Sequence, residues 1–158
     1  MEKVILILDG VNEGKTKFIE IIKRNNYWCW NVNPKNFLSM IAYKLGFNGE
    51  RDKRFFDFIS EFEEVANRYW NFEINYIQGL IQKFFDKSDP MVLIVHNCKP
   101  AISKLLQNKY ENCFNVLISD NDDENNNYCK VVNYLDDEFE DNVLKIMRIL
   151  SKNIGGNE

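Results

Sequence analysis

The feature that most constrains the fold is the opening segment, in which an aliphatic run is followed by a turn with glycines and then by a helical pattern. Residues Lys3 to Leu8 form an apolar run without the alternation of polar and apolar residues that marks a half-exposed strand. Such a run is typical of a strand buried on both faces, as in a parallel sheet. The turn covers Asp9 to Gly14, and apolar residues then recur at helical spacing from Lys15 to Arg24. The segment therefore predicts a strand–loop–helix unit.

The rest of the chain continues this alternation of strands and helices. Strands are expected at 27–32, 91–95, 114–118 and 129–132, and helices at 34–45, 50–70, 72–85, 100–110 and 139–150. Buried strands that alternate with helices predict a three-layer α/β/α fold around a five-stranded, doubly wound parallel sheet. Because no linker or internal repeat interrupts the pattern, residues 1–154 are expected to form a single domain, with 155–158 as a frayed tail.

Charge and composition limit the classes of partner. The formal net charge is −4, whereas a surface that binds nucleic acid needs clustered Lys and Arg. No apolar run approaches the roughly 18 residues of a membrane helix, and the first apolar run is too short for the core of a signal peptide. The four cysteines are scattered and there is a single His, which is the spacing of neither a zinc site nor a disulfide framework. We expect a cytoplasmic protein with no nucleic acid polymer and no membrane as partner, and its oligomeric state stays open.

The turn that ends in Gly14-Lys15-Thr16 is the segment that carries chemistry. Glycines allow successive backbone N–H groups to curl around phosphate oxygens, and the positive end of the following helix faces the anion. A Lys at the start of the helix reaches the terminal phosphates, and the hydroxyl of the next residue binds Mg²⁺. The pattern predicts a phosphate site formed by Gly10, Asn12, Gly14, Lys15 and Thr16, with Thr16 as the metal ligand.

The spacing of this turn departs from the standard motif. The standard motif has four residues between its first glycine and Gly-Lys. Here three residues separate Gly10 from Gly14, and Asp9 occupies the position of the first glycine. The Asp9 carboxylate, joined by Glu13 within the turn, would repel a phosphate. A shorter, narrower turn that does not bind phosphate tightly is therefore the alternative.

Four stretches give the chain a resemblance to a known family: VILILDGVNEGKTKF, IAYKLGFNGERDKRFFDF, VLIVHNCKP and CKVVNYLDDEFEDNVLKIMRIL. In this order they resemble the P-loop kinases of the adenylate-kinase-like group, and especially the phage-type deoxynucleoside monophosphate kinases. The resemblance implies a P-loop NTPase-type fold that binds a purine nucleotide, and transfer of the ATP γ-phosphoryl group, with Mg²⁺, to a (deoxy)nucleoside monophosphate. It implies that Lys15 contacts the β- and γ-phosphates, Thr16 the Mg²⁺, and Arg51 or Arg54 the acceptor phosphate.

The chain also departs from the pattern of that family. The Arg that family members place after the second core strand falls at Cys98, and the Glu that follows it falls at Ile102. Lys99 supplies a charge without the bidentate fork of an Arg. The stretch 120–127 is acidic where related kinases carry a basic lid over ATP. Since phosphoryl transfer depends on cations placed around the developing charge, the alternative is a catalytically inactive pseudo-kinase that serves as a nucleotide-binding or protein-interaction module.

The basic residues proposed for the acceptor site have a second interpretation. Arg51, Lys53 and Arg54 alternate with Asp52 and Asp57 near the start of a predicted helix. Such an alternation is also typical of a solvated helix face.

Other side chains are open to two interpretations as well. His96 ends a core strand at the edge where ligands bind in such sheets, yet it is also consistent with a satisfied, half-buried side chain. The aromatic residues that either stack on a base or belong to the core are Trp28, Trp30, Tyr69 and Trp70. The acidic run at 120–124 lacks the glycine and distal Glu of a calcium loop, and we expect a solvated loop.

Overall fold

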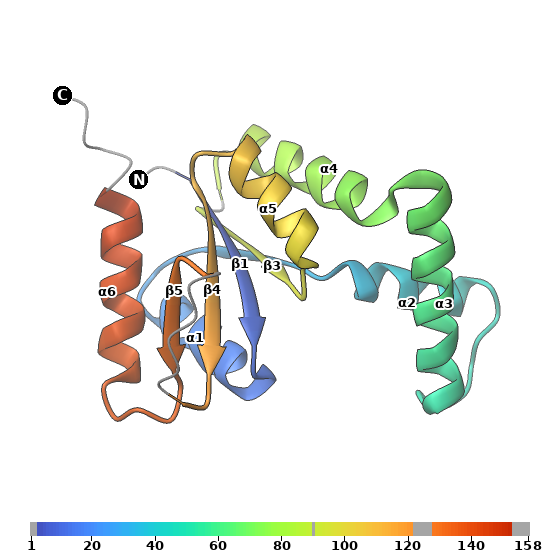
Figure 1. The fold of residues 1–158 in the computed structure, drawn as a ribbon, viewed down its shortest axis with the longest axis horizontal. Helices are drawn as coiled ribbons and strands as arrows, with labels where there is room; N and C mark the ends of the chain where they lie inside the picture. The colour runs from blue at the N-terminus through green and yellow to red at the C-terminus, as the bar shows by residue number, and fades with distance from the viewer. Residues whose placement is uncertain (1–2, 90, 122–127, 153–158) are drawn as a thin grey trace. The chain divides into compact units, whose positions relative to one another are not determined.

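The computed structural model describes residues 3–89, 91–121 and 128–152. Within these residues the chain is an α/β fold with a five-stranded parallel sheet and six helices (Figure 1). The strands are β1 (Val4–Gly10), β2 (Cys29–Val32), β3 (Val92–His96), β4 (Cys113–Ser119) and β5 (Lys130–Asn133). The helices are α1 (Asn12–Arg24), α2 (Pro34–Lys44), α3 (Lys53–Trp70), α4 (Phe72–Asp86), α5 (Pro100–Lys109) and α6 (Phe139–Lys152).

The sheet order is β2-β3-β1-β4-β5, so the first strand lies at its centre. β1 pairs in parallel with β3 on one side and with β4 on the other, and β4 pairs in parallel with β5. The predicted α/β class with a five-stranded parallel sheet is confirmed. The expected tail at 155–158 lies outside the described residues.

The chain divides into two compact units. The first comprises Met1–Asn31 and Phe84–Glu158, and the second Val32–Lys83. Each unit has its own apolar cluster, and each is described by itself below.

The core of the first unit explains the opening aliphatic run. Val4 to Leu8 are each at most 1% exposed, which means that β1 is covered on both faces. On one face Val4, Leu6 and Leu8 pack with Phe18 of α1 and with the apolar side of α6. On the other face α5 contacts β4. A strand covered on both faces needs apolar residues at every position, which is the pattern that the sequence shows.

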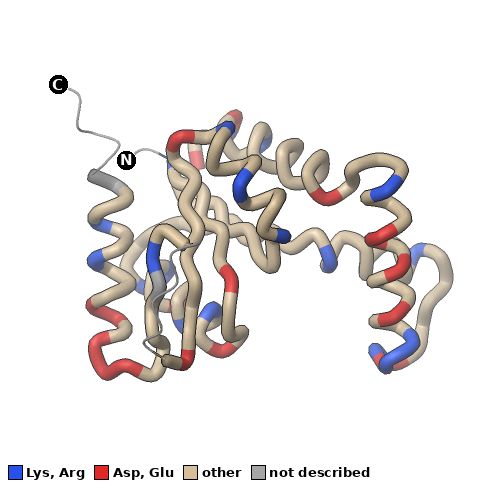
Figure 2. The backbone as a smooth tube through the Cα atoms, in the orientation of Figure 1, with Lys and Arg blue, Asp and Glu red and all other residues tan. Residues whose placement is uncertain are grey.

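Charges are segregated along α6 (Figure 2). Acidic residues lie at its start, where their negative charge interacts favourably with the positive end of the helix dipole. Basic residues follow further along the helix. One of the acids, Glu140, forms an ion pair of 2.6 Å with Arg24 at the end of α1. Because both side chains are about half exposed or more, this pair contributes little to stability.

The second unit is held together by α2 and α3. Four of their buried apolar residues form one cluster, which consists of Leu38, Ala42, Phe55 and Ile59. Asn33 caps α2 by accepting the backbone N–H of Lys35 at 3.0 Å, and Asp52 caps α3 by accepting that of Phe55 at 3.1 Å. The cap lowers the pKa of Asp52, because the backbone N–H of Phe55 favours the ionised carboxylate.

Candidate functional site

The carboxyl ends of β1, β3 and β4 form the edge of the sheet at which the candidate site lies. In open α/β sheets, ligands bind at this edge where connections leave in opposite directions. Here α1 leads from β1 to β2, and α5 leads from β3 across β1 to β4. The side chains that end these strands are therefore the first to consider, and they include Asp9, His96 and Asn97.

The turn between β1 and α1 is closed. Val11 is the only residue between the strand and the helix, which begins at Asn12. The Val11 N–H donates to the Ile118 carbonyl at 2.9 Å, and the Val11 carbonyl accepts the Lys15 N–H at 2.9 Å. The predicted open turn at 9–14, with a helix from Lys15, is wrong. The physical reason is that Val11 prolongs the pairing with β4, and the acidic Glu13 suits the first turn of a helix.

The two glycines of this segment allow the backbone to pack closely. Gly10 has a φ of +100°, and a Cβ there would lie 2.0 Å from the carbonyl oxygen of Ile118. A Cβ at Gly14 would lie 2.4 Å from Cγ2 of Ile118 and 2.8 Å from Cγ of Tyr134. Gly14 thus lets the first turn of α1 approach β4 and Tyr134. This is a packing role, and it accounts for the glycine without a phosphate.

Lys15 is buried in the first unit and already has a partner. Its side chain is 4% exposed, and its Nζ donates to Oδ1 of Asn97 at 2.8 Å. Asn97 follows β3 with a φ of +54°, in the left-handed region that Asn tolerates better than most residues. Burial lowers the pKa of Lys15, and the nearby Asp9 carboxylate opposes this shift.

Asp9 lies at the end of β1 and accepts two hydrogen bonds. Its Oδ1 accepts the Gly10 N–H at 2.8 Å, and its Oδ2 accepts the Tyr128 hydroxyl at 2.6 Å. Burial, together with the hydrogen bond and the charge of Asp9, raises the pKa of Tyr128 to about 12. The carboxylate is therefore a fixed acceptor at the position where the standard motif has a glycine.

His96 is the last residue of β3 and is half-buried. Burial, and secondarily the positive charge of Lys15, lower its pKa to about 4. The imidazole is neutral at neutral pH and so brings no positive charge to the edge of the sheet. This agrees with the interpretation of His96 as a half-buried side chain.

The residues predicted to hold Mg²⁺ and the triphosphate do not fit them as they lie. The Thr16 hydroxyl donates to the Asn12 carbonyl at 3.0 Å, inside the first turns of α1. Among the residues that the structure describes, no group of three or more His, Cys, Asp or Glu could hold a metal ion. The turn lacks the width of a loop that surrounds phosphates, Lys15 is bonded to Asn97, and the Asp9 carboxylate lies beside it.

The basic residues expected at the acceptor phosphate belong to the second unit. Arg51 Nε donates to the Tyr43 hydroxyl at 3.1 Å, and its guanidinium lies over the rings of Tyr43 and Phe55. Arg54 pairs with Asp52 at 3.2 Å on the exposed start of α3. Lys53 pairs with Asp57 at 2.7 Å, so this face has the charge pairing expected of a solvated helix.

The remaining sequence candidates have mixed outcomes. The interpretation of the tryptophans and Tyr69 as core is wrong for Trp28, Tyr69 and Trp70, which are 63–70% exposed. Cys98, at the position of the missing Arg, is buried beside α5. The acidic run lies outside the described residues at 122–127, so the expected acidic lid is not described.

A pocket with both polar and apolar lining opens between α5 and the sheet in the first unit, and we call it the α5 pocket. Its volume is about 570 Å³. The residues that line it include Ile7, Asp9, Ser103, Gln107, Asn115 and Tyr128. It therefore shares Asp9 and Tyr128 with the edge of the sheet.

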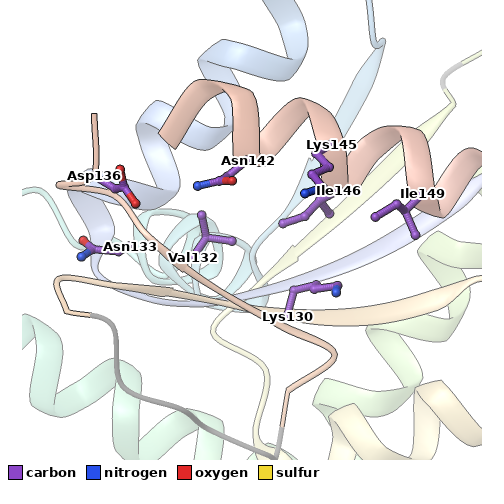
Figure 3. A pocket seen from close by; sticks show the side chains of 8 residues that line it. All are labelled: Lys130, Val132, Asn133, Asp136, Asn142, Lys145, Ile146 and Ile149. Atoms are coloured by element: carbon purple, nitrogen blue, oxygen red, sulfur yellow. The ribbon is translucent and has the colours of Figure 1, made fainter. Parts of the chain in front are cut away.

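A second pocket of about 270 Å³ lies between β5 and α6 (Figure 3). The residues around it include Lys130, Val132, Asp136, Lys145, Ile146 and Ile149, and they come from the edge strand, from α6 and from the connection between the two. It is smaller than the α5 pocket, and Asp9, His96 and Asn97 are not among the residues that line it.

Asn97 and Tyr128, the partners of Lys15 and Asp9, were not predicted from the sequence. Asn97 carries a weak local signal, because an Asn directly after a buried strand suits a left-handed turn. Tyr128 carries none, because its partner Asp9 is 119 positions away in the chain.

Comparison with protein-family models finds no match for this chain, and comparison with curated proteins finds none either. The likeness to nucleotide kinases is therefore carried by the residues quoted above. None of the helices in residues 3–89, 91–121 and 128–152 combines the length and the apolar character needed to cross a membrane.

Proposed function

We propose that this chain is a catalytically inactive protein of the P-loop nucleotide-kinase type, which binds a nucleoside-containing ligand at the carboxyl edge of its sheet. It transfers no phosphoryl group. In the cell it belongs to the cytoplasm, which suits four cysteines that are thiols in the described residues.

The observation that carries the proposal is the closed turn before α1. A phosphate loop presents several backbone N–H groups around one anion. In this chain Val11 alone separates β1 from α1, and the Lys15 N–H is already bonded within the helix. The side chains are bonded within the protein as well. The Lys15 ammonium donates to Asn97, and the Asp9 carboxylate accepts the Tyr128 hydroxyl. The Lys15 ammonium and the Lys15 N–H, which would contact a phosphate, are therefore both already bonded within the protein.

Electrostatics support the same conclusion. Phosphoryl transfer needs cations around the developing charge. Next to Lys15 the edge of the sheet presents the Asp9 carboxylate and a His96 that is neutral because its pKa is about 4. The charged groups at this edge of the sheet therefore do not provide the net positive charge that would attract a triphosphate.

The competing proposal is an active kinase, and one observation favours it. Gly14-Lys15-Thr16 lies directly after the central strand of a parallel sheet with the order β2-β3-β1-β4-β5. In that proposal ATP and Mg²⁺ are bound, Lys15 contacts the phosphates, and Arg51 or Arg54 contacts the acceptor. It would require the turn before α1 to open and Lys15 to leave Asn97.

A turnover assay separates the two proposals. The protein is incubated with ATP, Mg²⁺ and each common nucleoside or deoxynucleoside monophosphate, and release of ADP is measured. We expect no release above the protein-free rate, for the wild type or for Lys15→Met. Lys17→Met is the matched control, since Lys17 is two positions away and half exposed in its pair with Glu13. Turnover near the 1–100 s⁻¹ of kinases, abolished by Lys15→Met and retained by Lys17→Met, would establish the active kinase instead.

A further inference from the structure

Helix α3 of the second unit carries apolar side chains on an exposed face as well as on its buried one. The buried face includes Phe55 and Ile59, which pack in the cluster shared with α2. Beside it runs a second apolar row, which we call the α3 stripe and which consists of Phe58, Phe62, Val65 and Tyr69. Phe58 is 42% exposed, Val65 41% and Tyr69 70%, and Phe62 is half-buried. Single exposed apolar residues are ordinary, whereas a continuous row marks an interaction surface.

The spacing of the α3 stripe is that of a helix–helix seam. Its residues follow one another at steps of four, three and four positions, so that Val65 repeats Phe58 and Tyr69 repeats Phe62 after seven. A repeat of this kind keeps the apolar residues facing a second helix, as in coiled coils. The rings of Phe58 and Phe62 already stack, with centroids 5.8 Å apart and planes 18–20° from coplanar at 20°. The stripe extends about 17 Å along α3, and its shape fits another helix.

The charges beside the stripe indicate which helix that is. Acidic and basic residues both lie along α3 (Figure 2). Glu61 and Arg68 are exposed and lie on the side of the stripe that faces away from the buried face. Glu61 lies near the start of the stripe and Arg68 near its end, so an antiparallel copy of α3 brings Glu61 opposite the Arg68 of that copy. Their offset along the axis is then two residues, or about 3 Å.

This complementarity holds for one orientation of the two helices. In a two-fold arrangement each Glu61 meets an Arg68 and each Arg68 meets a Glu61, so the match occurs twice. In a parallel pair the same flank would face the side of the other helix that carries Ile59 and Ala66. These residues are buried and bring no charge.

Arg68 is available for such a contact. In the single chain it donates to Glu64 at 2.8 Å, four positions earlier on the same helix. Both side chains are more than half exposed, and an exposed pair of this kind is held only weakly. The guanidinium can therefore turn to a carboxylate on a second helix.

We propose that the α3 stripe is a self-association surface, on which a second copy of this chain packs its own stripe in the antiparallel direction. The seam is short, so the dimer is weak, with a dissociation constant on the order of 10–100 µM. The proposal goes beyond the proposed function and does not depend on it.

The first test is sedimentation equilibrium of the full chain from about 1 µM to about 300 µM. We expect the mass to rise from that of one chain toward that of two. Phe58→Ser should weaken the dimer by about tenfold or more, because it removes an aromatic from the seam. Phe56→Ser is the matched control: Phe56 is 54% exposed on the same helix but lies about 160° around it from Phe58, and its loss should leave the dissociation constant unchanged.

A charge exchange tests the antiparallel arrangement. Glu61→Arg and Arg68→Glu should each weaken self-association by about tenfold, because each places like charges opposite one another. An equimolar mixture of these two variants should dimerise at least as well as the wild type, since every contact then joins opposite charges. Recovery in the mixture also shows that both variants are folded.

Three results would overturn the proposal. The first is a protein that remains a single chain up to the highest concentration, which would leave the stripe to a partner of different chemistry. The second is a dimer that Phe58→Ser and Phe56→Ser weaken equally or not at all. The third is a mixture of the two charge variants that associates no better than either variant alone. None of them bears on the turnover assay above.

Discussion

The Lys15 ammonium and the side-chain oxygen of Asn97 are 2.8 Å apart and 82 positions apart in the chain. This bond joins α1 to the end of β3 across the centre of the sheet. It gives a buried cation a partner inside the protein, and a buried ammonium without one is costly. The residue with the strongest sequence signature for phosphate therefore has a structural role here.

Asn97→Gly tests that role directly. Glycine keeps the left-handed backbone but removes the acceptor of Lys15, so we expect the free energy of unfolding to fall by ~1–3 kcal/mol. Asn26→Gly is the matched control. Asn26 also has a positive φ, of +65°, and is exposed after α1 as Asn97 is exposed after β3, but it is not the residue to which Lys15 is bonded. Its change should stay within a few tenths of a kcal/mol. Urea denaturation measures both. Equal effects at the two positions would show that the Lys15–Asn97 bond does not stabilise the fold.

Gly14→Ala tests whether Gly14 is a packing residue. The added Cβ would meet Ile118 and Tyr134 at under 3 Å, so we expect a loss of ~1–3 kcal/mol in unfolding free energy. Gly79→Ala is the control within α4, because nothing lies within 4 Å of its added Cβ. There the better helix propensity of Ala should stabilise by up to about 1 kcal/mol. Thermal denaturation compares the two, and a stabilising Gly14→Ala would contradict the packing role.

Because His96 is half-buried and neutral, we expect it to make the free energy of unfolding decrease at acidic pH. Its pKa in the folded protein is about 4, below the usual 6.5, so the unfolded chain takes up the proton first. The contribution of this pKa difference to the free energy of unfolding is fully present above pH 6.5 and is lost as the pH falls toward 4. Between pH 7 and pH 5 the wild type should lose about 2 kcal/mol relative to His96→Gln.

Two measurements check this term. Urea denaturation of both proteins at several pH values gives the difference in unfolding free energy. Because the chain has one His, a single imidazole NMR signal reports the pKa without overlap. A midpoint near 6.5, with parallel stability curves for the two proteins, would contradict the burial of His96.

Tyr128→Phe tests the hydroxyl that orients Asp9. The change removes the bond of 2.6 Å to the Asp9 carboxylate and keeps the ring, so we expect a loss of ~1–2 kcal/mol in unfolding free energy. Tyr69→Phe is the control, because Tyr69 is 70% exposed. Both are measured by urea denaturation at pH 7. If the two variants were equally stable, Tyr128 would not be a partner of Asp9 in solution.

Much of the fold could be predicted from the sequence, because it is recorded in local patterns. The run from Val4 to Leu8 has no polar residue, which already requires a strand covered on both faces. The helices begin near the expected positions where a cap is visible, as at Asn33 and Asp52.

The candidate site could be predicted less well, because it depends on contacts between distant parts of the chain. The start of α1 is set by the bond from Val11 to the Ile118 carbonyl, and the need for a glycine at position 14 is set by Tyr134. No local pattern contains these contacts. The Gly-Lys-Thr signature thus suggested an open loop where tertiary packing closes it.

The most direct test of the central claim is an amide NMR titration of the ¹⁵N-labelled protein with ATP and Mg²⁺, observed at Asn12, Glu13, Gly14 and Lys15. These are the backbone N–H groups that a phosphate loop would offer, and here they belong to the first turn of α1. The account predicts no saturable shift at these four amides. A saturable shift at Gly14 and Lys15 that Lys15→Met abolishes would contradict it.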